Sequence, residues 1–187
     1  MNSLVKIILN IIPRSILTRL SFLLKPLIKI YLRGNKYVDP IDGSSFRKFL
    51  PYGYNNVREN ALSPSTFSLE RHRLLWLYLK NETDFFKKDL KVLHFAPEAA
   101  FLEKFKKLKN ISYDTIDLNS PLANIKADIC DLPLDDESYD FILCNHVLEH
   151  VIDDKKAMQE LYRVLKKDGI GIFQVPINIS NKKTYED

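Results

Sequence analysis

The residues best suited to chemistry are carboxylates, an amide and histidines that follow apolar, strand-like segments. Asp117 and Asp128 each follow such a segment, and Asn145 and His146 end the one that begins at Tyr139. In a parallel sheet the carboxyl ends of the strands meet at one edge, where α/β proteins gather ligand-binding groups. We therefore expect these side chains to share one site that accepts hydrogen bonds from a hydroxyl-bearing or cationic ligand.

The loop after the first of these segments contains no glycine. It reads Phe95, Ala96, Pro97 and Glu98, and no glycine occurs anywhere in residues 54–168. Because only glycine adopts positive φ at little cost, we expect this loop to rely on small alanines and on the fixed φ of proline. NAD and FAD need a glycine-rich helix N-terminus for their pyrophosphate, so the sequence disfavours both.

From residue 90 onward, apolar strand-like segments alternate with helical ones. Strands are predicted at about 91–96, 111–117, 125–129, 139–145 and 170–176, with helices near 99–109 and 154–167. This alternation implies right-handed crossovers and predicts an α/β fold with a doubly wound, Rossmann-like parallel sheet.

The last of these helices is the most clearly delimited. Asp153 or Asp154 is predicted to cap its start, and Asp168-Gly169 to end it. Its expected inward stripe comprises Ala157, Met158, Leu161, Tyr162 and Leu165.

Residues 1–33 form a basic, apolar arm. No acidic side chain precedes Asp39, whereas seven basic ones do: Lys6, Arg14, Arg19, Lys25, Lys29, Arg33 and Lys36. The charges leave no apolar run of about 18 residues, which disfavours a spanning helix and a cleaved signal peptide. Pro13 and Pro26 are expected to divide the arm into one or two amphipathic helical pieces. Such pieces could lie on an anionic membrane surface or pack against the domain or a partner.

Residues 34–68 are rich in turn formers and predict a small loop-rich module. A helix follows, with Ser68 or Thr66 as its N-cap, so the main domain is expected to span residues 69–187. The two cysteines, Cys130 and Cys144, lie in or beside apolar runs and are expected to be buried thiols of a reducing, cytoplasmic protein. Basic patches interleaved with aromatic residues are not evident in this half, which makes a nucleic-acid partner unlikely.

Several of these segments resemble a class I S-adenosylmethionine (SAM)-dependent methyltransferase of the type 11 group. The resemblance rests on the ordered segments 91–101, Asp117, Asp128 and 139–150, and on Arg163-Val-Leu-Lys-Lys-Asp-Gly169 before the fifth strand. The His94-Phe-Ala-Pro-Glu98 loop is similar to that of a subgroup of this family.

The resemblance implies SAM as the cofactor and a role for each site residue. Asp117, with Leu118 beside it, would receive the ribose hydroxyls, and Asp128 and Ile129 would face the adenine edge. Asn145 and His146 would form the turn beneath the methionine part of SAM. Phe95, Ala96, Pro97 and Glu98 would form the first loop, with Glu98 near the amino-acid end. His146, Glu149 and His150 are the candidate catalytic residues, as acid-base groups on the substrate side.

The resemblance also reaches into the loop-rich module, where relatives carry four cysteines. This chain keeps Phe46–Gly53 and Ser68–Arg73, but the cysteine positions read Asp39, Asp42, Ser63 and Thr66. Because hydroxyls and carboxylates are poor substitutes for four thiolates, no metal is expected, and the module is expected to be held by packing.

The expected function is methyl transfer from SAM to a small-molecule, lipid or glycan acceptor. A class I methyltransferase normally continues with a helix and two strands after the fifth strand, so the fold is expected to be C-terminally incomplete, as a fragment or a shortened form. The alternative is a non-catalytic scaffold of the same fold, or a membrane-associated protein that binds a partner. In either case the protein is expected in the cytoplasm, with a peripheral position at the inner membrane face if the arm binds lipid.

Overall fold

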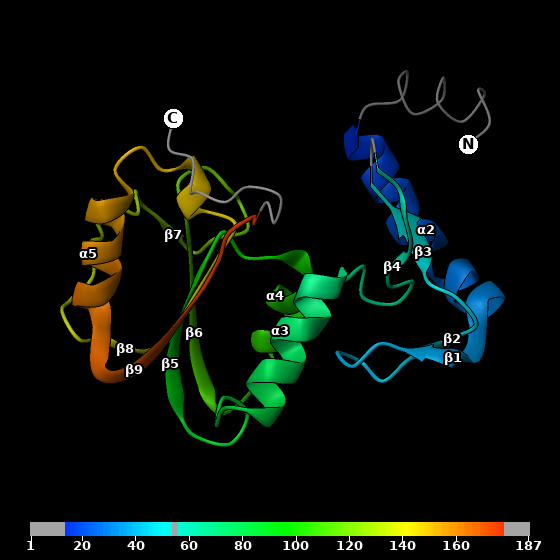
Figure 1. Cartoon of the computed structure of the whole chain (residues 1–187), viewed down its shortest axis with the longest axis horizontal. Coiled ribbons are helices and arrows are strands. Elements are labelled where there is room, and N and C mark those ends of the chain that lie inside the picture. Colours follow the sequence, from blue (N-terminus) through cyan, green and yellow to red (C-terminus); the bar gives the residue numbers. More distant parts are fainter. Residues whose placement is uncertain (1–13, 54–55, 178–187) are drawn as a thin grey trace. The chain divides into compact units, whose positions relative to one another are not determined.

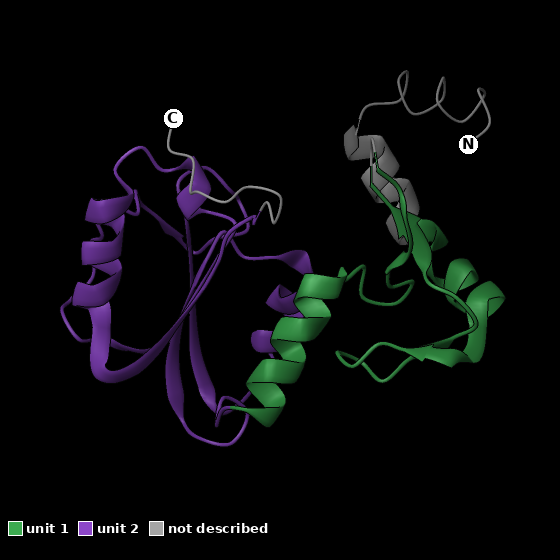
Figure 2. Ribbon diagram, in the orientation of Figure 1, with its two compact units in different colours: residues 1–82 green, residues 83–187 purple. Residues whose placement is uncertain are grey.

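The computed structural model describes residues 14–53 and 56–177. The chain divides into two compact units, residues 1–82 and 83–187 (Figure 2). The second unit contains a five-stranded parallel sheet in the order β7-β6-β5-β8-β9 (Figure 1). Its strands are β5 (Leu90–Phe95), β6 (Ile111–Asp117), β7 (Ile125–Lys126), β8 (Tyr139–Asn145) and β9 (Leu165–Gln174). The predicted Rossmann-like parallel sheet is thereby confirmed.

The direction of strand addition changes between β5 and β8. From β5 the chain moves outward through β6 and β7, then returns to place β8 on the other side of β5 and β9 beyond it. Such a switch point leaves a crevice at the carboxyl ends of the strands, where ligands of open α/β sheets bind.

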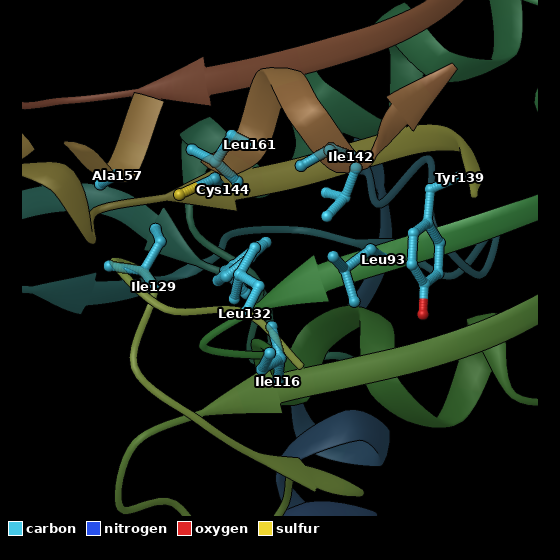
Figure 3. Packing of buried hydrophobic residues seen from close by; sticks show 11 residues of the cluster. Leu93, Ile116, Ile129, Leu132, Tyr139, Ile142, Cys144, Ala157 and Leu161 are labelled. Carbon is cyan, nitrogen blue, oxygen red and sulfur yellow. The ribbon is translucent and has the colours of Figure 1, made fainter. Parts of the chain in front are cut away.

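The core of this unit lies along the two central strands. Leu93 of β5 and Ile142 of β8 are completely buried, and Ile116 of β6 packs into the same cluster (Figure 3). Both central strands are buried on both faces, which explains why their sequences are apolar runs rather than alternating patterns. Cys144 is buried as expected, and burial raises the pKa of its thiol to about 12.

The helices of the second unit are α4 (Ala99–Phe105), the short 3-10 helix η1 (Leu148–His150) and α5 (Asp154–Val164). Asp153 caps α5 by accepting a hydrogen bond from the Lys156 amide at 2.9 Å. The predicted end of α5 was wrong. The helix stops at Val164 and passes directly into β9, and Asp168-Gly169 lies where the pairing of β9 with β8 shifts register.

The predicted inward stripe of α5 was also wrong in part. Ala157, Leu161 and Val164 are buried, whereas Met158 is 42% exposed and Tyr162 is 82% exposed. The buried residues follow the spacing i, i+4, i+7, which defines a narrower face than the apolar residue types suggested.

Arg163, at the end of α5, anchors the loop that follows β7. Its guanidinium donates to the carbonyl oxygens of Leu132 and Leu134 at 2.9 and 2.7 Å and binds both carboxylate oxygens of Glu160 at 2.8 Å. Hydrogen bonding from Arg163 lowers the pKa of Glu160 to about 2. These contacts fix the segment that carries Asp128 against the body of the unit.

In its described residues, 14–53 and 56–82, the first unit contains two helices and two small antiparallel sheets. These elements are α2 (Arg14–Leu32), β1 (Arg33–Val38), β2 (Ser45–Phe46), β3 (Leu50–Tyr52), β4 (Arg58–Leu62) and α3 (Glu70–Asn81). Pro26 does not divide the arm as predicted, because α2 continues through it. No helix in residues 14–53 and 56–177 is long and apolar enough to span a membrane.

The start of α3 also differs from the expectation. Its N-cap is Leu69 rather than Ser68 or Thr66, and the Leu69 amide donates to His72 Nδ1 at 3.0 Å. The division into compact units falls after Glu82 and groups α3 with the residues that precede it.

The loop-rich module contains two turns with the same backbone design. In one, the amide of Gly43 donates to the Asp39 carbonyl at 2.8 Å; in the other, the amide of Phe67 donates to the Ser63 carbonyl at 3.0 Å. The last residue of each turn has positive φ, +73° at Gly43 and +57° at Phe67. The four positions expected to carry cysteines in relatives are therefore the equivalent first and fourth residues of these paired turns.

A polar network, and not packing alone, joins the two turns. Asp39 is completely buried, and its Oδ2 lies 2.5 Å from the Thr66 hydroxyl and 3.3 and 3.4 Å from those of Ser65 and Ser68. The Ser65 hydroxyl also lies 3.1 Å from Asp42 Oδ1. Hydroxyl donors thus converge on one carboxylate where relatives are expected to have thiolates.

This network leads us to expect no stoichiometric zinc in the purified protein. Elemental analysis should find none, and a chelator should leave the melting temperature unchanged, because metal binding would otherwise contribute to folding. One zinc per chain that is removed together with stability would contradict this expectation.

Candidate functional site

A pocket of about 560 Å³ lies at the carboxyl ends of β5, β6 and β8, beside the switch point of the sheet. Its walls include these residues predicted for the site: Phe95, Ala96, Asp117, Leu118, Asp128, Ile129, His146 and His150. Of the other predicted residues, Pro97, Glu98, Asn145 and Glu149 do not line it. Most of the residues that were predicted for the site from the sequence therefore lie around one cavity.

Asp117 ends β6 and points a carboxylate into a tight turn. Its Oδ1 accepts hydrogen bonds from the amides of Asn119 and Ser120 at 2.8 and 2.6 Å. This arrangement fixes the side-chain orientation and engages one oxygen, so the second oxygen, Oδ2, is the one that can accept from a ligand. Leu118, which is 54% exposed, forms the neighbouring apolar wall.

Asp128 and Ile129 also line the pocket. Asp128 Oδ1 accepts from the Cys130 amide at 2.8 Å, and Ile129 is 8% exposed and belongs to the core cluster. Burial and the neighbouring Asp128 raise the pKa of the Cys130 thiol. Cys130 is therefore held as a neutral thiol and is not poised as a nucleophile.

The backbone conformation of the loop after β5 differs from the prediction. Ala96 has a φ of +45°, so the chain uses positive φ here without a glycine. The Ala96 amide donates to the Ile116 carbonyl at 2.9 Å, which holds the loop against the end of β6. His146, at the end of β8, likewise has a φ of +54°, and its amide donates to the Gln174 carbonyl at 2.7 Å. Two strained residues thus face the same pocket.

Replacing Ala96 by glycine should stabilise the protein. Left-handed backbone costs an L-residue roughly 1 to 2 kcal/mol, and glycine avoids that cost but loses more entropy on folding, by about 0.5 to 1 kcal/mol. We expect Ala96→Gly to raise the melting temperature by up to about 4 °C. Ala127→Gly, at another pocket-lining alanine whose φ is not positive, should lower it. A fall in melting temperature for Ala96→Gly would contradict the backbone assignment.

Glu98 and Asn145 meet next to the pocket. The Asn145 amide Nδ2 donates to Glu98 Oε2 at 3.1 Å, and Asn145 is 3% exposed. Pro97, which lies between the pocket-lining Ala96 and Glu98 in the sequence, is buried. The first loop and the end of β8 are therefore joined by a side-chain hydrogen bond, which places a carboxylate at their junction.

The predicted acid-base candidates are gathered around η1. His146 Nδ1 lies 3.1 Å from Glu149 Oε1, and His150 lines the pocket. His146 and Glu149 are therefore within hydrogen-bond distance of each other, while His150 lines the cavity separately.

The structure adds pocket residues that sequence reasoning missed. These are Ile116, Ala127, Cys130, Val147, Val151, Ile152 and Asp153. The apolar residues around η1 follow a buried strand and flank the predicted acid-base candidates. That position in the sequence is a signal that could have predicted them. Ile152 lines the pocket and is fully exposed.

Comparison with known proteins agrees with this geometry. A family model described as "Methyltransferase domain" matches residues 81–173. A demethylmenaquinone methyltransferase of Chlamydia caviae is 33% identical over 67 residues, which is 35% of this chain and 29% of that protein. The chain therefore spans less than a third of that curated relative.

Solved structures show similar, partial matches. A SAM-dependent methyltransferase from Aquifex aeolicus has a TM-score of 0.42 and 19% identity, covering 52% of this chain and 58% of its own. The YcgJ protein of Bacillus subtilis has a TM-score of 0.41 and 22% identity, covering 55% of this chain and 50% of its own.

Fold and site together define an α/β cofactor-binding protein whose pocket offers carboxylates and no phosphate cradle. This fits SAM, which carries hydroxyls, an ammonium and a sulfonium but no phosphate. The half-engaged Asp117 carboxylate and the Glu98 carboxylate beside the pocket are acceptors of the kind that such donors require. Residues 81–173 therefore form a methyltransferase domain of the class I, SAM-dependent type, and SAM is the cofactor that this type implies.

Proposed function

We propose that this chain is the catalytic portion of an enzyme that transfers the methyl group of SAM to a small-molecule, lipid or glycan acceptor. The observation that carries the proposal is the pocket at the switch point, which joins Asp117, Asp128 and the end of β8 within the segment matched by the methyltransferase family. Bound SAM supplies a methyl group already activated on a sulfonium.

The residues of the pocket would contribute mainly by binding and orienting. Asp117 Oδ2 would accept from the ribose hydroxyls, and Asp128 and Ile129 would hold the adenine edge. Glu98 would receive the ammonium of the amino-acid end. Because the methyl donor is already activated, alignment alone can supply roughly 7 to 11 kcal/mol of barrier reduction.

A base is needed only for an acceptor that must lose a proton. The pair of His146 and Glu149, in contact at 3.1 Å, supports that role: the imidazole would take the proton and the carboxylate would stabilise the resulting cation. His150, on the cavity wall, is the alternative base. Both thiols are free, which supports the proposal of a reducing, cytoplasmic location.

Calorimetric titration tests the cofactor assignment directly. SAM and its demethylated product should each give saturable heat with a stoichiometry near one, whereas NAD should give none because the pocket lacks a phosphate cradle. A folded protein that shows no saturable binding of SAM would instead be the non-catalytic scaffold. The full-length protein should then be incubated with isotopically labelled SAM and a panel of lipids, glycans and small molecules, including a demethylated quinone because one relative is named for such an acceptor.

A second function, attachment to an anionic membrane surface, is favoured by α2. Leu23, Leu27 and Ile30 lie on one face of this helix at the spacing i, i+4, i+7 and are 74%, 63% and 73% exposed. The arm that contains them has cations and no acidic residue. An exposed apolar face flanked by cations is the pattern of helices that lie in the membrane interface.

Liposome co-sedimentation should show this attachment. Each Lys or Arg near an anionic bilayer contributes about 1 kcal/mol before screening, so binding should rise with anionic lipid content and fall with salt. Deleting residues 1–33 should abolish it, and the double variant Leu27→Asp, Ile30→Asp should weaken it strongly. Leu74→Asp, at a residue 66% exposed on α3, is the matched control and should bind as the wild type does. Equal binding by the deleted and intact proteins would rule out the arm.

A further inference from the structure

His94 is a buried histidine whose two ring nitrogens both face polar groups. It lies in β5, is 0% exposed, and packs against the rings of Phe101 and Phe105 at 6.3 and 6.2 Å between centroids. Nδ1 lies 2.7 Å from the Tyr113 hydroxyl, and Nε2 lies 3.4 Å from Glu98 Oε2. Packing explains the contacts with Phe101 and Phe105. It does not explain why polar side chains from two different elements lie at the two nitrogens of the same ring.

The electrostatics of this ring select one tautomer. Burial, followed by the nearby Glu98, raises the pKa of Tyr113, so its hydroxyl keeps its proton and can donate to His94 Nδ1. Nε2 then carries the imidazole hydrogen. In the opposite tautomer the lone pair of Nε2 would face a carboxylate oxygen 3.4 Å away, which is repulsive. The Glu98 carboxylate therefore favours the form with hydrogen on Nε2, and the Tyr113 hydroxyl can donate to Nδ1 in that form.

Glu98 is not used in the way its position suggests. It occupies the N-cap of α4, where a carboxylate commonly accepts from the helix amides, yet its side chain makes no capping hydrogen bond. Its Oε2 instead accepts from Asn145 and lies near His94 Nε2, a buried atom with no hydrogen bond in the described structure. The Glu98 side chain remains 14% exposed. The carboxylate is thus contacted by Asn145 and lies beside His94, while part of the side chain remains exposed.

We propose that His94 and Tyr113 are positioning residues that direct the Glu98 carboxylate toward the ammonium of bound SAM. The chain of contacts runs from the Tyr113 hydroxyl through the His94 ring to Glu98 Oε2, with Asn145 as a second donor. This inference rests on the proposed function, because it takes SAM as the ligand. His94 Nε2 and Glu98 Oε2 lie 3.4 Å apart, and we expect this distance to shorten to that of a hydrogen bond when SAM binds. Hydrogen bonds in such sites are often long before the ligand is bound.

Two probes separate positioning from general stability. SAM carries the ammonium, whereas 5′-methylthioadenosine shares its adenosine and lacks the amino-acid end. Tyr113→Phe keeps the ring that packs edge-on against Phe105 and removes only the hydroxyl. We expect this variant to weaken SAM binding by about 3- to 10-fold, the effect of one hydrogen bond, with no change in the dissociation constant for 5′-methylthioadenosine.

Phe101→Leu is the matched control, because it disturbs the packing around His94 and leaves the Tyr113 hydroxyl and the Glu98 carboxylate in place. It should lower the melting temperature and leave the ratio of the two dissociation constants unchanged. If Tyr113→Phe also leaves that ratio unchanged, the positioning role is wrong even though the wild type binds SAM. If the wild type binds neither probe, the proposed function itself fails, and this inference fails with it.

The tautomer provides a test that needs no variant. Long-range nitrogen-proton correlation spectra of the wild type should show a hydrogen on His94 Nε2. A hydrogen on Nδ1 alone would overturn the proposal, because the ring could then offer no donor to Glu98.

Discussion

Asp117→Asn should weaken SAM binding by about 10-fold or more while leaving the fold intact. The side chain uses Oδ1 to accept from the Asn119 and Ser120 amides, and asparagine can keep that oxygen in place. Its NH2 group would replace Oδ2 and could not accept from the ribose hydroxyls. Each charge-assisted hydrogen bond lost removes on the order of 1.5 to 3 kcal/mol of binding, less any replacement by water. Calorimetric titration measures the change.

Asp117→Ala provides the comparison that separates binding from structure. It removes both the ribose acceptor and the support of the turn, so it should weaken SAM binding at least as much and also lower the melting temperature. Asp114→Asn is the matched control, because Asp114 lies on the same strand and contacts Tyr139 and Asn124 outside the pocket. An unchanged dissociation constant in a folded Asp117→Asn would show that this carboxylate only supports its turn.

The positions of Asp117, Asp128 and Asn145 could be predicted because they depend on local and topological rules. Apolar runs mark buried strands, the alternation with helices makes the strands parallel, and parallel strands bring their carboxyl ends together. Once the strand ends were identified, the pocket followed from the order of the sheet.

What could not be predicted was set by tertiary contacts. Ala96 has a positive φ, and its amide donates a hydrogen bond to the Ile116 carbonyl. No local sequence pattern predicts this contact between two strand ends. Asp168-Gly169 is an ordinary helix-ending signal, yet α5 ends earlier because β9 begins pairing with Tyr139 at Leu165. The exposed positions of α5 were misjudged for the same reason: residue type indicates what can be buried, not which face has a neighbour.

The polar network of the module was hidden because it depends on two distant turns. A chain that reads Asp39, Asp42, Ser63 and Thr66 looks like a metal site that lost its ligands. The shared turn geometry, with positive φ at Gly43 and Phe67, brings the two segments together nonetheless. Side chains of the two turns then hydrogen-bond to each other directly, with the Asp39 carboxylate as the shared acceptor.

The largest stability effect is therefore expected for Asp39→Ala. Asp39 accepts from the Ile41 amide at 3.0 Å on one oxygen and faces the hydroxyls of Thr66, Ser65 and Ser68 with the other. Removing it leaves buried donors without their acceptor. It also removes the negative charge that offsets the burial of Arg73, whose pKa is lowered by desolvation. A loss on the order of 3 to 5 kcal/mol is typical when one partner of a buried charged contact is deleted.

Chemical denaturation with a probe in the first unit measures this loss, and two variants calibrate it. Asp42→Ala removes a less buried carboxylate that contacts only the Ser44 amide and the Ser65 hydroxyl, so it should cost clearly less. Asp39→Asn keeps the shape and one acceptor, and its amide can donate to hydroxyl oxygens, so its cost should fall between the two. If Asp39→Ala costs no more than Asp42→Ala, the carboxylate is not the hub of the module, and apolar packing around Phe46 and Phe49 must hold the two turns together instead.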